Sequence, residues 1–291
     1  MSSEKPAGAV RRALGRLPLG RLVNRAPVVS VLRLNGVIGR LGPLRGAGLS
    51  LEGIERMIAR AFDQRGLKAV ALAVNSPGGS PVQSALIAGR IRQLADEKKI
   101  PVFAFAEDVA ASGGYWLLAA GDEIFADDSS IIGSIGVISA GFGFHELLAR
   151  HGIERRVHAS GARKAMLDPF RAEDAGDVAR LEVLQADIHD HFKDHVRARR
   201  GDKLKGSDEQ LFNGDIWSGK QALALGLIDG IGDLRSVMRE RFGERVKLRT
   251  VAERRGVLRR RLGLAAAPTG ELAGEIIAAL DEWAAWRRFG L

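Results

Sequence analysis

The sequence predicts an α/β domain with a largely parallel sheet. Three stretches rich in Val, Ile, Ala or Phe predict strands, and a helical pattern of apolar residues follows each of them. Strands that alternate with helices are typical of parallel sheets. Glycine is abundant (36 residues) and aromatic residues make up only 5% of the chain, which suits a fold with glycine turns better than a β-sandwich. At 291 residues, the chain has room for one large domain or two small ones.

In the first half, strands are expected at 27–38, 67–76 and 100–108. Two further strands are expected at 122–128 and 134–139. The helices between them are marked by apolar residues at helical spacing: Leu49, Ile54, Met57 and Ile58 for the first, and Ile87, Ile91 and Leu94 for the second. The third helix is apolar on all sides from Tyr115 to Ala120, so we expect it to be buried.

The second half is more helical and more polar. Residues 177–201 predict a long amphipathic helix that Gly201 ends, with an apolar face formed by Leu181, Leu184, Ile188 and Phe192. A small unit follows at 211–232, then an Arg-rich segment and a final helix that carries Trp283 and Trp286. We therefore divide the chain into a basic N-terminal arm (1–26), a central domain (27–245) and a basic segment with the C-terminal helix (246–291).

The net charge of +9 is concentrated near the two ends. Residues 1–40 hold eight Lys or Arg and one acid, and residues 239–261 hold ten and three, so each stretch carries +7. The remainder is mildly acidic, which argues against a nucleic-acid partner. Basic ends suit peripheral contact with an anionic membrane surface, and they equally suit solvated tails. No transmembrane segment or signal peptide is visible, and no cysteine is present to form disulfides or thiolate metal sites.

Two glycine-rich turns join a strand to a helix and are the first candidates for chemistry. The turn "NSPGGS" at 75–80 can direct free backbone N–H groups at one point, as an anion or oxyanion site requires, although a plain tight turn would also explain it. The turn "DVAASGGYW" at 108–116 places Ser112 at the start of the buried helix. Its hydroxyl could be an exposed nucleophile with the Gly113 N–H nearby, or a simple helix N-cap.

A nucleophilic serine needs a base, and none of the six histidines lies in a pattern that suggests a triad. Lysine can serve instead when burial or a neighbouring positive charge favours its neutral form. Lys164 lies among small and apolar residues in "HASGARKAMLDPF", and Ser134 offers a hydroxyl that could hold its amine. On spacing alone, an ordinary surface lysine explains this residue as well.

Taken together, the motifs resemble those of the signal peptide peptidase A (SppA, protease IV) family of serine peptidases, in its short form. The resemblance runs from Pro27 to Gly232 and includes "NSPGG", "DVAASGGYW", "SSIIGSIGV", "SGARKAMLDPF" and "WSGKQALALGLID" in the family order. It implies a crotonase-like fold, shared with the Clp protease subunit, here with a helical C-terminal extension. It also implies cleavage of signal peptides or other short hydrophobic peptides.

The resemblance assigns a role to each candidate residue. It implies that Ser112 is the nucleophile, Lys164 the general base and Ser134 the residue that holds the lysine amine. The N–H groups of Gly79 and Gly113 correspond to the oxyanion hole. The family's short form implies a homo-oligomer in which Ser and Lys come from adjacent subunits. No cofactor or metal is implied.

This sequence departs from the family in two places, and two other functions stay open. No N-terminal membrane anchor is visible, so we expect a cytoplasmic protein or one peripheral on the inner membrane. Arg163 stands before Lys164, where the family often has an aromatic residue. One alternative is an acyl-CoA-processing enzyme of the crotonase superfamily. The other is a membrane-associated peptidase of the kind that cleaves stomatin-like proteins, or a non-catalytic scaffold at the membrane.

Overall fold

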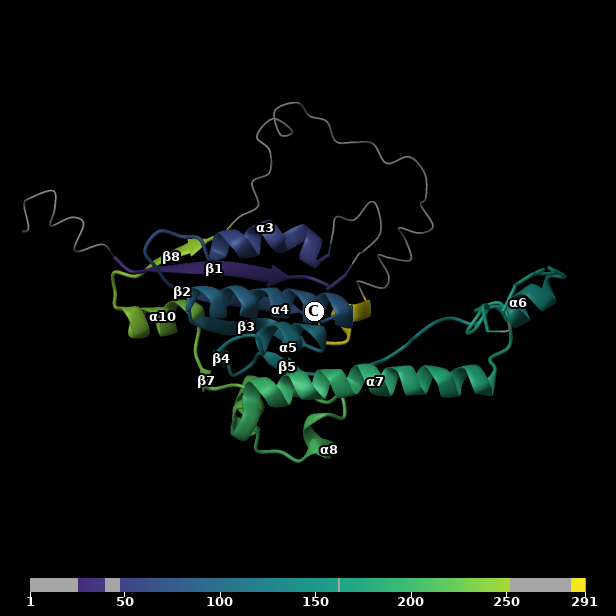
Figure 1. The fold of residues 1–291 in the computed structure, drawn as a ribbon. Helices are drawn as coiled ribbons and strands as arrows, with labels where there is room; N and C mark the ends of the chain where they lie inside the picture. Colours follow the sequence, from purple (N-terminus) through teal and green to yellow (C-terminus); the bar gives the residue numbers. More distant parts are fainter. Residues whose placement is uncertain (1–25, 40–47, 162, 252–283, 291) are drawn as a thin grey trace, which may run out of the picture.

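The computed structural model describes residues 26–39, 48–161, 163–251 and 284–290. It forms an eight-stranded sheet with helices on both faces (Figure 1). The elements in chain order are β1 (Val28–Asn35), α3 (Leu51–Ala61), β2 (Leu67–Ser76), α4 (Pro81–Lys98), β3 (Val102–Ala111), α5 (Gly113–Leu118), β4 (Glu123–Ala126), β5 (Ile131–Gly133), α6 (His145–Arg150), α7 (Ala175–Arg200), a 3-10 turn (Gly201–Lys203), α8 (Asp208–Leu211), β6 (Ile216–Ser218), α9 (Gly219–Ala224), β7 (Gly230–Ile231), α10 (Leu234–Phe242) and β8 (Lys247–Thr250).

The predicted parallel sheet is confirmed. The strands run in the order β6-β5-β3-β2-β1-β8, with β4 pairing β3 and β7 pairing β4, and every pair is parallel except β5 with β6. Helices α3, α4 and α5 pack on one face, where Ile58, Ile91 and Leu117 are buried. Helix α10 covers part of the other face with Val237 and Met238. The sheet continues through β8, beyond residue 245, at which the sequence-based division ends the central domain.

Strand β3 is longer than predicted because it contains a bulge. The sequence suggested an end at the polar pair Glu107–Asp108, but the strand runs on to Ala111. Its register with β2 shifts there, from Val74 opposite Ala106 to Ser76 opposite Ala110. The Asn75 side chain stabilises the bulge, donating to the Asp108 carboxylate at 2.7 Å and accepting from the Val109 N–H at 3.2 Å. Before the bulge β3 pairs with β4, and after it with β5.

The strand predicted at 134–139 is wrong. The structure has strand β5 at Ile131–Gly133, and no strand follows over 134–139. Gly133 and Ser134 have φ angles of 110° and 51°, which are incompatible with continued extended backbone. The Val/Ile content of "SIGVIS" suggested a strand, but the chain turns away from the sheet at this point.

Helix α7 agrees with its predicted bounds, but its apolar face is only half covered. The C-terminal half buries Phe192 and Val196, and the helix ends at Gly201 as predicted. The N-terminal half extends beyond the sheet, and α6 lies near its far end (Figure 1). Leu184, which the sequence places on the buried face, is therefore 52% exposed. The N-terminal arm and Trp283 lie outside the described residues, and of the final segment the structure describes 284–290, including Trp286.

No helix in the described part of the chain has the length and apolar character needed to cross a membrane.

A buried ion pair fastens α7 to the sheet. The Arg200 side chain is 1% exposed, and it donates to Asp229 at 2.8 and 3.1 Å and to the Gly226 carbonyl at 2.9 and 2.7 Å. Burial alone would raise the pKa of Asp229, but hydrogen bonds from Arg200 and Lys203 hold that pKa below its usual range. Asp229 also accepts from the Ile124 N–H of β4 at 2.8 Å.

We expect Arg200→Met to lower the free energy of unfolding by about 3 kcal/mol, because it leaves the Asp229 carboxylate and the Gly226 carbonyl without their main donor. Urea denaturation measures the change. Arg197→Gln on the same helix is the control, since the Arg197 side chain is 42% exposed in its ion pairs with Asp194 and Asp208. Its expected cost is below about 1 kcal/mol. Equal losses in the two variants would contradict the role given to Arg200.

Candidate active site

Ser112 lies where β3 joins α5, in a strained backbone conformation. Its φ of 52° and ψ of −124° fall outside the regions that non-glycine residues favour. The Ser112 N–H donates to the Gly133 carbonyl at 2.7 Å, and the Ser112 carbonyl accepts from the Trp116 N–H at 3.1 Å. The side chain makes no capping hydrogen bond, so the structure does not support the N-cap interpretation. The hydroxyl is left partly exposed and without a partner among the described residues.

Two backbone N–H groups lie side by side next to Ser112. Ile38 pairs with the turn after β2, donating to the Gly78 carbonyl and accepting from the Ser80 N–H, each at 2.8 Å. This pairing leaves the Gly79 N–H directed away from Ile38. Gly113 begins α5, where an N–H has no partner within the helix. Neither N–H donates to another described residue.

The close approach of these two turns requires glycine. A Cβ atom on Gly113 would lie 2.4 Å from Ser84 Oγ and 3.4 Å from the Gly79 nitrogen. A Cβ atom on Gly79, whose φ is 141°, would lie 2.1 Å from the Ile38 carbonyl oxygen. Paired N–H donors beside a free hydroxyl can stabilise a negative oxygen formed when that hydroxyl attacks a carbonyl.

Ser134 lies beside Ser112 at the end of the neighbouring strand. Ala111 and Gly133 are register partners in β3 and β5, so the two serines follow directly from a paired position. The Ser134 N–H donates to the Asp215 carbonyl at 2.6 Å, and its φ is 51°. The residue is 8% exposed, and its hydroxyl has no partner among the described residues.

A narrow cavity of about 10 Å³ adjoins Ser112. It is walled by apolar side chains of α5, α7 and the segment after β5, and Trp116 stacks on Phe192 with ring centroids 4.6 Å apart. Its lining consists of Gly79, Pro81, Ser112, Gly113, Trp116, Gly136, Val137, Ile188 and Phe192. The surface next to the serine is therefore mainly apolar, although the cavity itself has room for no more than about one water molecule.

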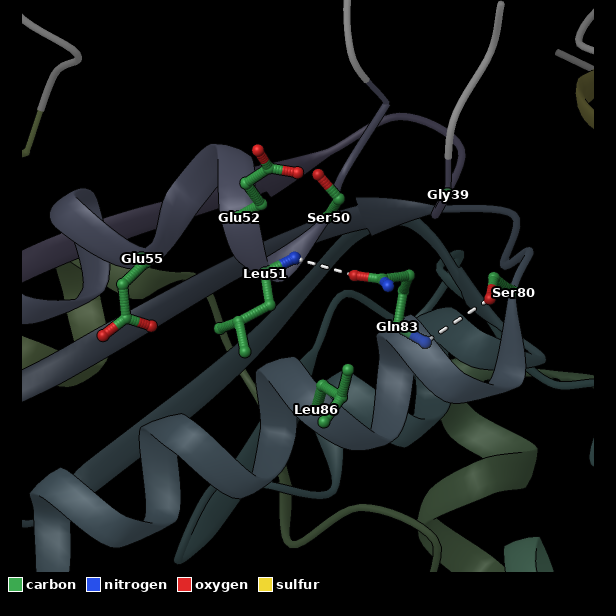
Figure 2. Close-up of a pocket in the computed structure, with 8 residues that line it drawn as sticks. All are labelled: Gly39, Ser50, Leu51, Glu52, Glu55, Ser80, Gln83 and Leu86. Carbon is green, nitrogen blue, oxygen red and sulfur yellow. Dashed lines mark hydrogen bonds between the residues drawn. The ribbon is translucent and has the colours of Figure 1, made fainter.

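A larger cavity of about 600 Å³ lies between α3 and α4 (Figure 2). The Leu51 N–H donates to Gln83 Oε1 at 2.9 Å across it, and Ser80 Oγ accepts from the Gln83 N–H at 3.4 Å. It shares no lining residue with the cavity at Ser112. Ser112 is not among its lining residues, so this cavity does not contain the candidate nucleophile.

The structure does not bring Lys164 to Ser112 within one chain. Lys164 lies in an exposed turn, where its N–H donates to the Gly161 carbonyl at 3.1 Å. We call the segment 137–174 the arm, as distinct from the basic N-terminal stretch, and the sheet with the helices packed on it the body. The arm leaves the body after β5 and contains α6, which lies near the N-terminal end of α7 (Figure 1). Large apolar side chains on the arm and on the adjoining part of α7 are exposed: Ile138, Phe142, Leu147, Ile153, Val183 and Leu184. Such a surface is typical of one that another molecule covers.

Histidines on α7, to which the sequence analysis gave no role, fasten this helix to the site. His195 Nε2 lies 3.2 Å from the Trp116 carbonyl oxygen, and its ring stacks on Trp116 with centroids 5.1 Å apart. His189 Nε2 lies 3.2 Å from the carbonyl oxygen of Ile135, next to Ser134. Burial lowers the pKa of His195 to about 4, against the opposing effect of its contact with Trp116. The available signal was three histidines at steps of two and four residues along one helix, but this spacing did not show what they face.

Comparisons with known proteins identify a family for this chain. The model of Peptidase family S49 matches residues 94–247. A Brucella abortus protein named Na(+)/H(+) antiporter NhaA is 48% identical over 272 residues, which cover 90% of this chain and 37% of that protein. The chloroplastic serine protease SPPA of Arabidopsis thaliana is 32% identical over 71% of this chain and 31% of its own length. Protease 4 of Haemophilus influenzae is 34% identical over 62% of this chain and 29% of its own.

A membrane-bound stomatin-specific protease is similar among solved structures, with a TM-score of 0.48 and 16% identity over 79% of this chain and all of that one. This chain spans about a third of the length of the curated relatives described above.

The parallel sheet with helices on both faces defines an α/β protein of the crotonase-like fold. The chain belongs to Peptidase family S49, whose model covers more than half of it.

We expect Ser112→Gly to raise the free energy of unfolding by about 1 kcal/mol, because glycine adopts this backbone conformation without strain. Ser218 provides the matched control, since it forms a capping box at the start of α9. Ser218→Ala should lower stability by about 1 kcal/mol. Urea denaturation of both variants gives the comparison, and a loss of stability in Ser112→Gly would mean that Ser112 serves the helix.

We expect stability to fall between pH 6.5 and 4 through His195. The unfolded chain binds a proton at an ordinary histidine pKa, but the folded chain binds it only near pH 4. The contribution of neutral His195 to the free energy of unfolding is thus complete above pH 6.5. It is lost as the pH falls to 4, by up to about 3 kcal/mol. Denaturation across this range should show a flatter dependence in His195→Gln. An unchanged slope in that variant would contradict the assignment.

Proposed function

We propose that this protein is a serine endopeptidase with a Ser–Lys dyad, which cleaves signal peptides or other short hydrophobic peptides. The observation that carries the proposal is the Ser112 hydroxyl, strained and unpartnered, beside the free N–H groups of Gly79 and Gly113 in a chain of Peptidase family S49. Strain at a functional serine is expected where its position matters more than local stability.

The proposed reaction begins with Ser112 Oγ attacking the peptide carbonyl. Neutral Lys164 takes the hydroxyl proton, and the N–H groups of Gly79 and Gly113 stabilise the tetrahedral oxyanion. The lysine then gives its proton to the departing amine, which leaves an acyl-enzyme on Ser112. Water, deprotonated by the lysine, hydrolyses this ester and regenerates the serine. The Ser134 hydroxyl holds the lysine amine close to Ser112.

We propose that the lysine comes from a neighbouring copy of the chain. The arm that carries Lys164 extends from the body and exposes Ile138, Phe142 and Leu147, and a second copy would cover these side chains. A site shared between copies explains why each chain leaves the hydroxyls of Ser112 and Ser134 without a partner. It also means that a single chain is inactive.

The proposed substrates follow from the lining next to Ser112. Trp116, Val137, Ile188 and Phe192 offer an apolar surface with no charged group among the lining residues. An apolar side chain beside the cleaved bond would gain most from contact with this surface. The basic stretches at residues 1–40 and 239–261 support contact with an anionic membrane, where hydrophobic peptides accumulate.

We expect Ser112→Ala and Lys164→Ala each to lower peptide hydrolysis at least about a thousandfold without unfolding. A fluorogenic hydrophobic peptide measures the rate. Full activity in Lys164→Ala would contradict the proposed Ser–Lys dyad.

When the two inactive variants are co-expressed, each mixed site that combines an intact Ser112 with an intact Lys164 becomes active. Random assembly should restore about a quarter of wild-type activity. Mixed assemblies without any recovery would contradict a dyad shared between copies.

A further inference from the structure

A group of side chains outside the site holds the turn that carries Lys164. The Asp168 carboxylate lies four residues after Lys164, and its Oδ1 atom pairs with Arg155 Nη1 at 3.2 Å. The same oxygen accepts from the Phe170 N–H at 3.1 Å. The Arg155 guanidinium also lies over the Phe170 ring, 4.5 Å from its centroid. We call Arg155, Asp168 and Phe170 the clamp.

The clamp joins two parts of the arm that are distant along the chain. Arg155 comes from the segment after α6, whereas Asp168 and Phe170 follow the Lys164 turn. Phe144, just before α6, adds a backbone hydrogen bond to the Pro169 carbonyl at 2.6 Å and a ring contact with Phe170 at 5.6 Å. These contacts fix the turn on an arm whose other surfaces are largely exposed.

The Asp168 carboxylate is buried, and only one of its two oxygens has a partner among the described residues. Its side chain is 5% exposed, and the Oδ2 atom is buried with no hydrogen-bond partner among the described residues. A buried acceptor without a donor is unfavourable, and a charged one more so. Stability alone therefore does not account for a carboxylate at this position, which suggests that it serves function.

We propose that Asp168 is a positioning residue for Lys164. This inference rests on the proposed dyad. A general base must come within hydrogen-bond reach of the proton that it takes, and small displacements lower the rate strongly. Lysine has a long flexible side chain, so its turn must be held by other groups. Asp168 fixes that turn through Arg155 and Phe170.

Asp168→Asn tests this proposal in the full chain. The amide keeps an acceptor for the Phe170 N–H but removes the charge that pairs with Arg155. We expect kcat on a fluorogenic hydrophobic peptide to fall at least about tenfold, with KM within about twofold. The thermal midpoint should stay the same or increase.

Two further variants complete the test. Arg155→Lys keeps the charge but loses the planar contact with Phe170, so we expect an intermediate loss of kcat. Arg156→Gln is the matched control, because Arg156 pairs with Glu154 in the same segment with its side chain 74% exposed. It should leave kcat unchanged.

Wild-type kcat in Asp168→Asn would overturn the proposal, as would parallel losses of kcat and thermal midpoint in Asp168→Asn and Arg155→Lys. Failure of the dyad itself is recognised separately, by activity that persists in Lys164→Ala.

Discussion

The bulge in β3 is the constraint on which the rest of the site depends. Two extra residues enter the strand opposite Val74–Ser76, and Asn75 satisfies the polar groups that they expose. The strand can therefore leave β4 and continue beside β5, which carries Ser112 to the Gly133 carbonyl. Without this change of partner, Ser112 would not meet the Gly79 turn and the Ser134 turn at one point.

The body and the arm divide the proposed chemistry between them. The body holds a strained serine rigidly, since its backbone is bonded on both sides and lies against close-packed glycines. The arm holds the lysine turn by a few polar and aromatic contacts and leaves its apolar side chains in solvent. Under the proposed dyad, this division makes activity depend on assembly, because an isolated chain would offer the nucleophile without its base.

Much of the fold was predictable from the sequence because its signals are local. The strand at 67–76 and the helix over residues 177–201 follow from runs and spacings that one segment contains. The bulge could not be predicted from the sequence. Two adjacent acidic residues, Glu107 and Asp108, are typical of a strand end, and only the contact with Asn75 on the neighbouring strand explains why β3 continues. Ser134 was likewise placed in a strand because its neighbours are rich in Val and Ile, although its positive φ is incompatible with a strand. The family motifs indicated Ser112 and Lys164, but the clamp around Asp168 depends on contacts across the arm.

The most direct measurement of the central claim is a crystal structure of the assembled Ser112→Ala variant with a bound hydrophobic peptide. We expect one carbonyl oxygen of the peptide within hydrogen-bond distance of the Gly79 and Gly113 nitrogens. We also expect the Lys164 amine of a neighbouring copy to face position 112 and to contact the Ser134 hydroxyl. A peptide bound elsewhere, or a lysine amine that stays remote from position 112 in every copy, would contradict the account.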